Sequence, residues 1–351
     1  MQSDEKNVQT CSQGADADVM VSIICITFNH APFLHKALDG FLMQRTNFRF
    51  EVLLHDDAST DGTAEIVKAY AKKYPDIIVP ILEKENQYSQ HIDFSQKMYA
   101  MARGKYFAFC EGDDYWIDAD KLQKQFDYME AHPDCSICGH NSFILDDRER
   151  DHPHLKETVT EDYAESTFTM EDLLRDHLID HGLYPMASVF MRRECVPHYP
   201  WLRRFSFGDL FMVLTPFRYG YGYRSNAKMA VYRVNNPGSY NGVRNQLPHH
   251  ERIQKWINFR FEFLEGLEYF NRETEYRWDS LIQELKEKIK YQRLPMMYLE
   301  YSSTRMCLPL LWLNSVLLAH PRLKNIMGRI CRKSAVLNRL KSFIKRHLIK
   351  S

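Results

Sequence analysis

The fold class of this chain is decided by the stretch Val19-Met-Val-Ser-Ile-Ile-Cys-Ile-Thr-Phe-Asn29. Its first eight residues form a continuous run of mainly β-branched and other apolar side chains, and polar residues lie on both sides of the run. Such a run is typical of a strand that is buried on both faces of a parallel sheet. The preceding segment, residues 1–18, has no apolar period, and we expect it to be disordered.

Strand-like and helix-like segments alternate after this point. The predicted strands are 19–26, 50–54, 77–82, 106–110, 184–191 and 229–233, and the predicted helices are 32–43, about 61–73, 94–103, the end of 206–214, and most of the chain from residue 251. Strict alternation over the first 110 residues predicts an α/β fold with a doubly wound sheet. We therefore expect one α/β domain over 19–250 and a mostly helical region over 251–351.

Polar side chains follow three of the predicted strands at the point where each strand ends. They are Thr27-Phe28-Asn29, Asp56-Asp57 and Glu111-Gly112-Asp113-Asp114. In doubly wound sheets, ligands bind beyond the carboxyl ends of the strands. The three groups are therefore expected at one edge of the sheet, around one ligand.

Asp113 and Asp114 could bind a divalent metal ion. Mg²⁺ and Mn²⁺ prefer oxygen ligands, and either ion can neutralise a diphosphate leaving group while a glycosidic bond breaks. An isolated pair of acidic residues is more often a solvated loop or a helix cap, so the pair alone leaves both interpretations open.

Three segments together carry a family resemblance. Val21 to Asn29, the segment Asp56-Asp-Ala-Ser-Thr-Asp-Gly-Thr63, and Arg103-Gly-Lys-Tyr106 followed by Cys110-Glu-Gly-Asp-Asp-Tyr-Trp116 occur in the order and spacing found in family 2 of the glycosyltransferases. The chain resembles this inverting, nucleotide-sugar-dependent family over about its first 140 residues. The resemblance implies a GT-A fold, a Rossmann-like mixed sheet flanked by helices.

The resemblance also implies roles for single residues on the donor side. Thr27, Phe28 and Asn29 would line the donor pocket, with Phe28 against the nucleobase, although core packing is an equal alternative for this side chain. Asp57, with or without Asp56, would accept the imide hydrogen of the base. Asp113 would contact the ribose or the diphosphate, and Asp114 would bind Mg²⁺ or Mn²⁺ directly.

Two residues of the second half complete the implied site. Asp209, in Gly208-Asp209-Leu210, matches the general base that would deprotonate the acceptor, while a helix cap at Leu210 is the alternative interpretation. Many relatives have a Tyr-Arg-x-His segment whose His contributes to the metal or diphosphate site. Here the segment ends in Asn235, a neutral oxygen ligand that would bind the metal more weakly.

The charge of the chain is unevenly distributed. Residues 321–351 contain ten Lys and Arg residues and no acidic residue, so the remaining 320 residues carry 36 basic against 46 acidic side chains. Apolar residues recur at helical spacing in this basic tail, and the apolar stretch 306–319 precedes it. Residues 306–351 are therefore expected to bind an anionic membrane surface, with a helix docked on the enzyme as the alternative. A nucleic-acid partner is not expected, because the tail lacks interleaved aromatic residues.

Together these features predict a hexosyltransferase that moves a sugar, with inversion, from a nucleoside-diphosphate sugar to a saccharide or lipid-linked saccharide acceptor. UDP-sugar is the leading donor, and cell-surface polysaccharide or glycolipid synthesis is the expected setting. Scattered cysteines and a polar start of the sequence favour the cytoplasm, at the inner face of the membrane. The main alternative is a GT-A protein that binds a nucleotide sugar or glycan without catalysis. A nucleotidyltransferase is less favoured, because no glycine-rich loop follows the first strand.

Overall fold

The structure is a computed structural model. It describes residues 18–90, 92–147, 156–157, 164–177, 184–205, 208–236 and 239–290. The predicted disorder of the N-terminal segment and the predicted membrane-binding tail at 306–351 lie outside the described residues, apart from Asp18.

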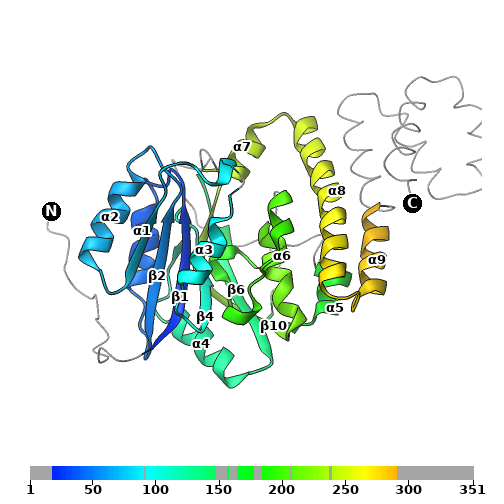
Figure 1. The fold of residues 1–351 in the computed structure, drawn as a ribbon, viewed down its shortest axis with the longest axis horizontal. Helices are drawn as coiled ribbons and strands as arrows, with labels where there is room; N and C mark the ends of the chain where they lie inside the picture. Colours follow the sequence, from blue (N-terminus) through cyan, green and yellow to red (C-terminus); the bar gives the residue numbers. More distant parts are fainter. Residues whose placement is uncertain are drawn as a thin grey trace, which may run out of the picture. The chain divides into compact units, whose positions relative to one another are not determined.

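Ten strands form one mixed sheet among the described residues. They are β1 (Val19–Thr27), β2 (Arg49–Asp56), β3 (Ile78–Leu82), β4 (Tyr106–Phe109), β5 (Tyr115–Trp116), β6 (Cys135–Asp146), β7 (Lys156–Glu157), β8 (Ser166–Phe168), β9 (Phe190–Arg192) and β10 (Tyr221–Val234). The strand order is β3-β2-β1-β4-β9-β6-β10-β5, with β7 paired to β6 and β8 paired to β10. Figure 1 shows β1, β2 and β4 side by side.

The helices alternate with these strands in the first half and dominate after β10. The α-helices are α1 (Leu34–Leu42), α2 (Thr63–Lys73), α3 (Phe94–Met101), α4 (Lys121–Ala131), α5 (Met170–Asp172), α6 (Gly208–Leu214), α7 (Tyr240–Gln246), α8 (His249–Glu273) and α9 (Asp279–Lys288). Single turns of tighter or wider helix are η1 (Tyr88–Gln90), η3 (Leu173–His177), η4 (Met186–Ser188), η5 (Arg193–Cys195), η6 (Pro200–Arg204) and η7 (Thr215–Arg218).

The direction of the strands changes in the middle of the sheet. β1, β2, β3 and β4 run parallel, as the alternating sequence predicted. β9 then pairs antiparallel with both β4 and β6. β10 runs parallel to β6 and antiparallel to β5, so the short strand after Asp114 is attached to the second half of the chain. The predicted mixed α/β sheet is thus confirmed.

Two predicted strands of the second half differ from the structure. The segment 184–191, predicted as a strand, contains η4, and its strand β9 begins only at Phe190. The segment 229–233 is the end of β10, which begins at Tyr221. Both differences arise because tertiary pairing, rather than the local apolar pattern, decides where these strands begin.

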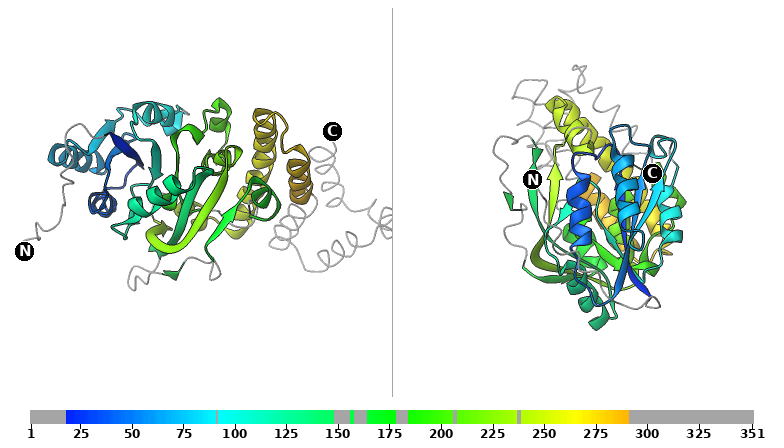
Figure 2. Two further views of the ribbon diagram at one scale, coloured as in Figure 1. Left: turned by 90° about the horizontal axis from the view of Figure 1, so that it is seen from below. Right: turned by 90° about the vertical axis from the view of Figure 1, so that its left-hand side faces the viewer.

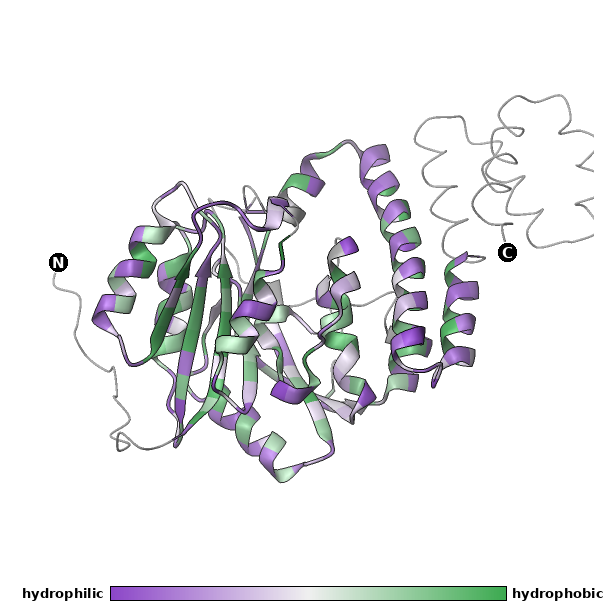
Figure 3. Cartoon of the chain, in the orientation of Figure 1, coloured by the Kyte–Doolittle hydropathy of each residue, from purple (hydrophilic) through white to green (hydrophobic). Residues whose placement is uncertain are grey.

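Helices cover both faces of the sheet (Figures 1 and 2). Side chains from α1, α2 and α4 form one core cluster with the face of β1 and β2 that carries Val21, Ile23, Cys25, Val52 and Leu54. On the other face, Phe94 of α3 stacks on His55, with ring centroids 4.2 Å apart. Figure 3 shows hydrophobic residues concentrated in the strands, whereas the helices carry both hydrophilic and hydrophobic residues.

The chain divides into two compact units. The first comprises Met1–Gln246 and Tyr269–Arg277, and the second comprises Leu247–Glu268 and Trp278–Ser351. The first unit contains the sheet. In the second unit, an ion pair between Lys286 and Glu268 joins α9 to α8. In the part of the chain described, we find no helix with the length and apolar character that crossing a membrane requires.

Candidate active site

The three polar groups lie at one edge of the sheet, as their positions after the strands predicted. β1 lies between β2 and β4, so the ends of these strands are neighbours. The backbone joins them directly, because Asp57 N donates to Thr27 O at 3.0 Å and Gly112 N donates to Ile26 O at 3.0 Å. The residues after β1, β2 and β4 therefore share one continuous edge.

The loop after β1 presents Phe28 to solvent. The Phe28 side chain is 46% exposed, so it is available to stack on a ligand rather than buried in the core. Asn29 adopts a left-handed backbone with φ 55°, and its side-chain Oδ1 accepts the Thr60 N–H at 2.9 Å. Asn29 N in turn donates to Ser59 Oγ at 2.8 Å. These bonds fix the loop that carries Phe28 against the loop after β2.

Asp56 and Asp57 hold two different loops. Asp56 accepts hydrogen bonds from Ser59, while Thr27 Oγ1 donates to its Oδ1 at 3.2 Å. Asp57 is buried and accepts the backbone N–H groups of Gln87 at 2.6 Å and Tyr88 at 3.0 Å. Each carboxylate oxygen has more than one lone pair, so these bonds leave Asp57 able to accept a further donor from a ligand.

The acidic pair after β4 is buried. Asp113 is 8% exposed and Asp114 is 1% exposed. Arg233 N donates to Asp114 Oδ1 at 2.7 Å, and Asn236 Nδ2 donates to Asp113 Oδ2 at 2.9 Å. The other oxygen of each carboxylate, Asp113 Oδ1 and Asp114 Oδ2, is buried without a hydrogen-bond partner. Buried polar atoms are rarely left unpaired, so these two oxygens indicate a position for an absent ligand.

Arg233 fastens the acidic segment to the end of β10. Besides its backbone bond to Asp114, its Nε donates to Asp113 O at 3.0 Å. Its guanidinium also pairs with Asp147 at 2.6 Å and lies over the ring of Phe33, 4.4 Å from the centroid. One residue thus holds both acidic residues in position, through its backbone N–H and its guanidinium, and its charge offsets part of that of Asp114.

The charges of four carboxylates act on Tyr232. Burial raises the pKa of Tyr232, and the charges of Asp114, Glu111, Asp113 and Asp209 raise it further. Asp209, from the second half of the domain, therefore acts on the same tyrosine as the acidic pair.

The acidic groups also act on one another. The protein crowds the carboxyl of Glu111, although part of the residue remains open to solvent, and this desolvation with the charges of Asp113 and Asp209 raises its pKa to about 8. Burial also raises the pKa of Asp114, with Asp113 and Glu111 adding to the shift and Arg233 opposing it. Such a cluster ionises fully only when a positive charge is added.

Asp209 lies in the first turn of α6, as the second residue of the helix. Its Oδ1 accepts the Leu210 N–H at 2.9 Å, so the carboxylate satisfies one free N–H of the helix start. Desolvation of the carboxyl raises its pKa, and the bond from Leu210 opposes this shift. The two interpretations of Asp209, base and helix-start acceptor, are therefore compatible.

Asn235 does not join the acidic pair. Its Nδ2 donates to Asp146 Oδ1 at 2.8 Å, and its Oδ1 accepts from Asn245 Nδ2 at 2.6 Å. Its backbone is left-handed, with φ 62°, and the next residue, Asn236, is the one that meets Asp113. The structure therefore brings Asp113, Asp114 and Asn236 together, whereas the resemblance implied Asn235.

The residues present fit a hard divalent cation. In the described part of the chain, no three His, Cys, Asp or Glu side chains gather as a metal site. A cation would use Asp114 Oδ2 and Asp113 Oδ1, which accept no hydrogen bond, although Asp113 Oδ1 lies 3.9 Å from His30 Nδ1. Amide, water or phosphate oxygens would complete a set typical of Mg²⁺ and Mn²⁺.

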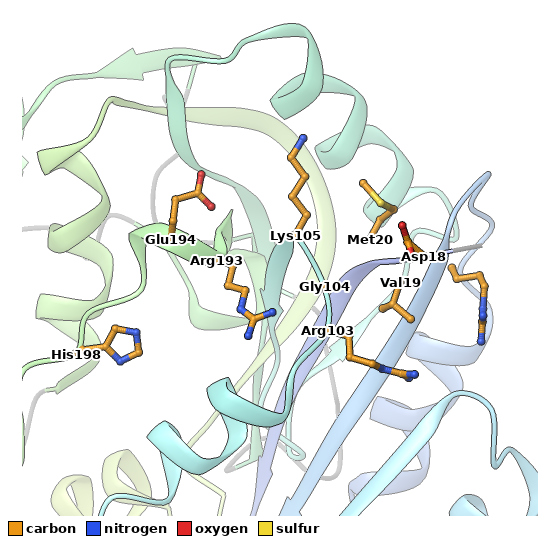
Figure 4. Close-up of a pocket in the computed structure, with 10 residues that line it drawn as sticks. Asp18, Val19, Met20, Arg103, Gly104, Lys105, Arg193, Glu194 and His198 are labelled. Atoms are coloured by element: carbon orange, nitrogen blue, oxygen red, sulfur yellow. The ribbon is translucent and has the colours of Figure 1, made fainter. Parts of the chain in front are cut away.

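A cavity of about 800 Å³ lies at the opposite edge of the sheet (Figure 4). It is lined by Asp18, Val19, Met20, Arg49, Arg103, Gly104, Lys105, Arg193, Glu194 and His198. Arg103 pairs with Glu51 at 2.7 Å and Lys105 pairs with Glu130 at 2.5 Å, so two of its cations are already neutralised. The carboxylates of Asp56, Asp57, Asp113 and Asp114 lie instead at the edge formed by the carboxyl ends of β1, β2 and β4. We therefore place the candidate site at that edge and not in the cavity.

Residues 22–196 match the family model described as glycosyl transferase family 2. The chain belongs to glycosyl transferase family 2. It is similar to the uncharacterized protein Rv1520 of Mycobacterium tuberculosis, with 47% identity over 120 residues, 34% of each chain. It is also similar to the uncharacterized glycosyltransferase MG025 homolog of Mycoplasma pneumoniae, with 34% identity over 100 residues, 28% of this chain and 32% of the relative. The chain thus spans about a third of the length of these relatives.

The family fold is also found in a solved structure. The mannosyltransferase PcManGT from Pyrobaculum calidifontis, in complex with GDP-Man and Mn²⁺, superposes with a TM-score of 0.50 at 17% sequence identity, covering 90% of this chain and 87% of that protein. At this identity the likeness concerns the fold, and it agrees with the GT-A class expected from the sequence.

Three residues of the site of this family 2 chain were missed at the sequence level. Glu111 and Arg233 lie inside segments that were recognised, but neither was given a role. Asn236 directly follows the segment that resembles Tyr-Arg-x-His. Finding it would have required aligning Asn236, instead of Asn235, with the histidine of that segment.

Proposed function

We propose that this chain transfers a hexosyl group, with inversion, from a UDP-sugar to a saccharide acceptor. The observation that carries the proposal is the buried pair Asp113 and Asp114, each with one unpaired oxygen, beside the ends of β1 and β2. A nucleoside diphosphate bound across these strand ends would place its phosphates at the acidic pair and its base near Phe28 and Asp57.

The donor side would divide its work among four residues. Phe28 would stack on the nucleobase, because its ring is exposed at the sheet edge. Asp57 would accept the imide hydrogen of the base, Asp113 would contact the ribose or diphosphate, and Asp114 would hold Mg²⁺ or Mn²⁺. When bound, the metal supplies charge that stabilises the departing diphosphate.

The acceptor side would depend on Asp209. Its carboxylate would take the proton of the acceptor hydroxyl as the hydroxyl oxygen attacks the anomeric carbon. The bond from that carbon to the diphosphate oxygen breaks with its electron pair, and the nucleoside diphosphate leaves. Attack from the side opposite the leaving group inverts the configuration.

We further propose that the acceptor is a saccharide, free or lipid-linked, in cell-surface polysaccharide or glycolipid synthesis. Support comes from the family resemblance and from the basic residues of 321–351, which would hold the enzyme at the inner face of the membrane.

Calorimetric titration with UDP, GDP, CDP and dTDP, each with and without Mn²⁺, tests the donor assignment. We expect tight binding of UDP only, strengthened by Mn²⁺. Asp114→Asn should remove the effect of Mn²⁺, because it removes the carboxylate charge while retaining an acceptor for the Arg233 N–H.

Binding of none of the four nucleotides would contradict the proposal. Binding of UDP without transfer to any saccharide of an acceptor panel would instead favour a nucleotide-sugar-binding protein. Thermal unfolding of Asp114→Asn, measured beside the wild type, separates loss of the metal from loss of the fold.

A further inference from the structure

Three buried oxygen atoms at the site lack hydrogen-bond partners. They are Asp113 Oδ1, Asp114 Oδ2 and Asn236 Oδ1. Leaving such atoms unpaired is unfavourable, so native structures rarely retain them without a reason. Two of the three belong to the acidic pair, and the third belongs to a residue that hydrogen-bonds to that pair.

The orientation of the Asn236 amide follows from its neighbours. Its Nδ2 faces Asp113 Oδ2 at 2.9 Å, because an amide oxygen in that place would repel the carboxylate. Oδ1 must then point to the other side of the amide, where it is buried and unpaired. Asn236 is 1% exposed, so its amide oxygen cannot instead be satisfied by bulk water.

We propose that Asn236, and not Asn235, supplies an amide oxygen to the divalent cation bound by Asp114. This inference rests on the proposed function, which places a cation at Asp114. Asn236 would thus take the position that a histidine of the Tyr-Arg-x-His segment takes in many relatives, one residue later in this chain.

Asn235 is committed to a different structural task. Both ends of its amide are used, by Asp146 at 2.8 Å and Asn245 at 2.6 Å. These bonds connect the end of β6 and helix α7 to the end of β10. Releasing either end for a metal ion would break one of them.

The ligand type predicts a metal preference. Carboxylate and amide oxygens suit Mg²⁺ and Mn²⁺, whereas an imidazole nitrogen suits Co²⁺, Ni²⁺ and Zn²⁺ better. An all-oxygen set of protein ligands should therefore bind Mn²⁺ without the strong additional preference for Ni²⁺ that a histidine would confer.

Titration of Mn²⁺ followed by electron paramagnetic resonance, in the presence of saturating UDP, tests the inference. Asn236→Ala should weaken Mn²⁺ binding about tenfold or more, the size of loss seen when a residue that holds or orients a metal is removed. Asn235→Gly is the matched control from the neighbouring position, because glycine keeps the left-handed backbone while the amide is removed. Its Mn²⁺ affinity should stay within about threefold of the wild type. Asn236→His should raise the affinity for Ni²⁺ relative to Mn²⁺, a change that requires an intact fold.

The inference is overturned if Asn236→Ala binds Mn²⁺ like the wild type, or if Asn235→Gly loses as much affinity as Asn236→Ala. Either result leaves the proposed transferase standing, because UDP binding and the Mn²⁺ response of the wild type remain. If Asn236→Ala fails to fold, the ratio of Ni²⁺ to Mn²⁺ affinity in Asn236→His decides, and an unchanged ratio overturns the inference. Transfer by a wild type that needs no divalent metal would also overturn the inference while sustaining the transferase.

Discussion

Asp209 is the residue that we propose as the general base. Its carboxylate accepts the Leu210 N–H, and its charge raises the pKa of Glu111 and of Tyr232. Asp209→Asn keeps an acceptor for Leu210 but removes the basic oxygen. We expect turnover to fall about 100-fold or more, the contribution typical of a general base, while UDP binding changes less than about twofold.

Steady-state transfer assays and calorimetry on the same preparations measure both quantities. Because the pKa of Asp209 is raised, the rate of the wild type should fall with decreasing pH at values above the ordinary aspartate range. Asp209→Glu should recover part of the rate, since it restores a carboxylate. Full activity in Asp209→Asn would assign the base to another residue.

His140 should make the stability of the fold depend on pH. It is fully buried in β6, where Nδ1 donates to the Asn141 backbone oxygen at 2.7 Å and Nε2 has no partner. Burial lowers the pKa of His140 well below 6.5, and the nearby Lys121 lowers it further. As pH falls, His140 therefore takes up a proton in the unfolded state before it does so in the folded state. The stabilisation that depends on neutral His140 is present above pH 6.5. Below pH 6.5 the free energy of unfolding should decrease by about 1.4 kcal/mol per pH unit.

Urea unfolding at pH 7 and pH 5 measures this effect. Between these values the wild type should lose roughly 2 kcal/mol more unfolding free energy than His140→Asn, whose amide keeps the donor to Asn141 but does not titrate. The same substitution at the exposed His132 controls for general effects of removing an imidazole. Equal losses in wild type and His140→Asn would show that His140 is not responsible.

Single residues differ in how far their sequence context predicts them. Asp113 and Asp114 could be placed because they follow a buried strand, and the carboxyl ends of parallel strands share an edge. Asn235 and Asn236 could not be told apart, because the left-handed backbone at Asn235 decides which amide meets Asp113. Asparagine adopts this conformation more readily than most residues, but the sequence does not show which of two will do so.

At the scale of elements, helix α1 and strand β5 approach each other closely. A Cβ atom on Gly40 would lie 2.9 Å from the Trp116 backbone oxygen and 3.0 Å from the Trp116 nitrogen. These are backbone atoms that cannot rotate away, so Gly40→Ala should displace β5. We expect the free energy of unfolding to decrease by about 1–3 kcal/mol. This loss exceeds the stabilisation that alanine would contribute through its higher helix propensity.

The displacement should also reach the site, because β5 follows Asp114 directly. Chemical unfolding and Mn²⁺-dependent UDP binding of Gly40→Ala test both effects. Gly208→Ala is the matched comparison for stability, since Gly208 also lies in a helix but no atom lies within 4 Å of its added Cβ. If Gly40→Ala and Gly208→Ala have the same free energy of unfolding, α1 and β5 can move apart without loss of stability.

The elements themselves were predicted unequally along the chain. β1 to β4 and the helices between them follow from apolar runs that end in polar turns, and their observed limits lie within a few residues of the expected ones. β9 was missed at its start because η4, which precedes it, is held in place by contacts to strands distant in sequence. β6 is buried on both faces over most of its length, so it has no alternation from which its pairing could be deduced.

For the molecule as a whole, the uneven charge predicts salt-dependent binding to membranes. Replacing four basic residues of the tail by glutamine, at Lys341, Lys345, Arg346 and Lys350, removes four charges that would face anionic lipid. At about 1 kcal/mol for each charge, binding to vesicles of anionic phospholipid should weaken roughly 1,000-fold at low salt.

Co-sedimentation with anionic and with zwitterionic vesicles, at low and high salt, measures the effect. The wild type should bind only the anionic vesicles and should dissociate in high salt, because screening shortens the range of the attraction. Equal binding of the variant and the wild type would show that the tail packs on protein instead.

The bonds from Arg233 to Asp114 and from Asn236 to Asp113 span 119 and 123 residues of the chain. Chains are made from the amino terminus, and contacts of such sequence separation form late. The parallel strands can therefore assemble during synthesis while Asp113 and Asp114 still lack these two partners. A nonsense mutation or a proteolytic cut between β5 and β10 would leave a fragment that keeps β1 to β4 but in which Asp113 and Asp114 lack both of these hydrogen bonds.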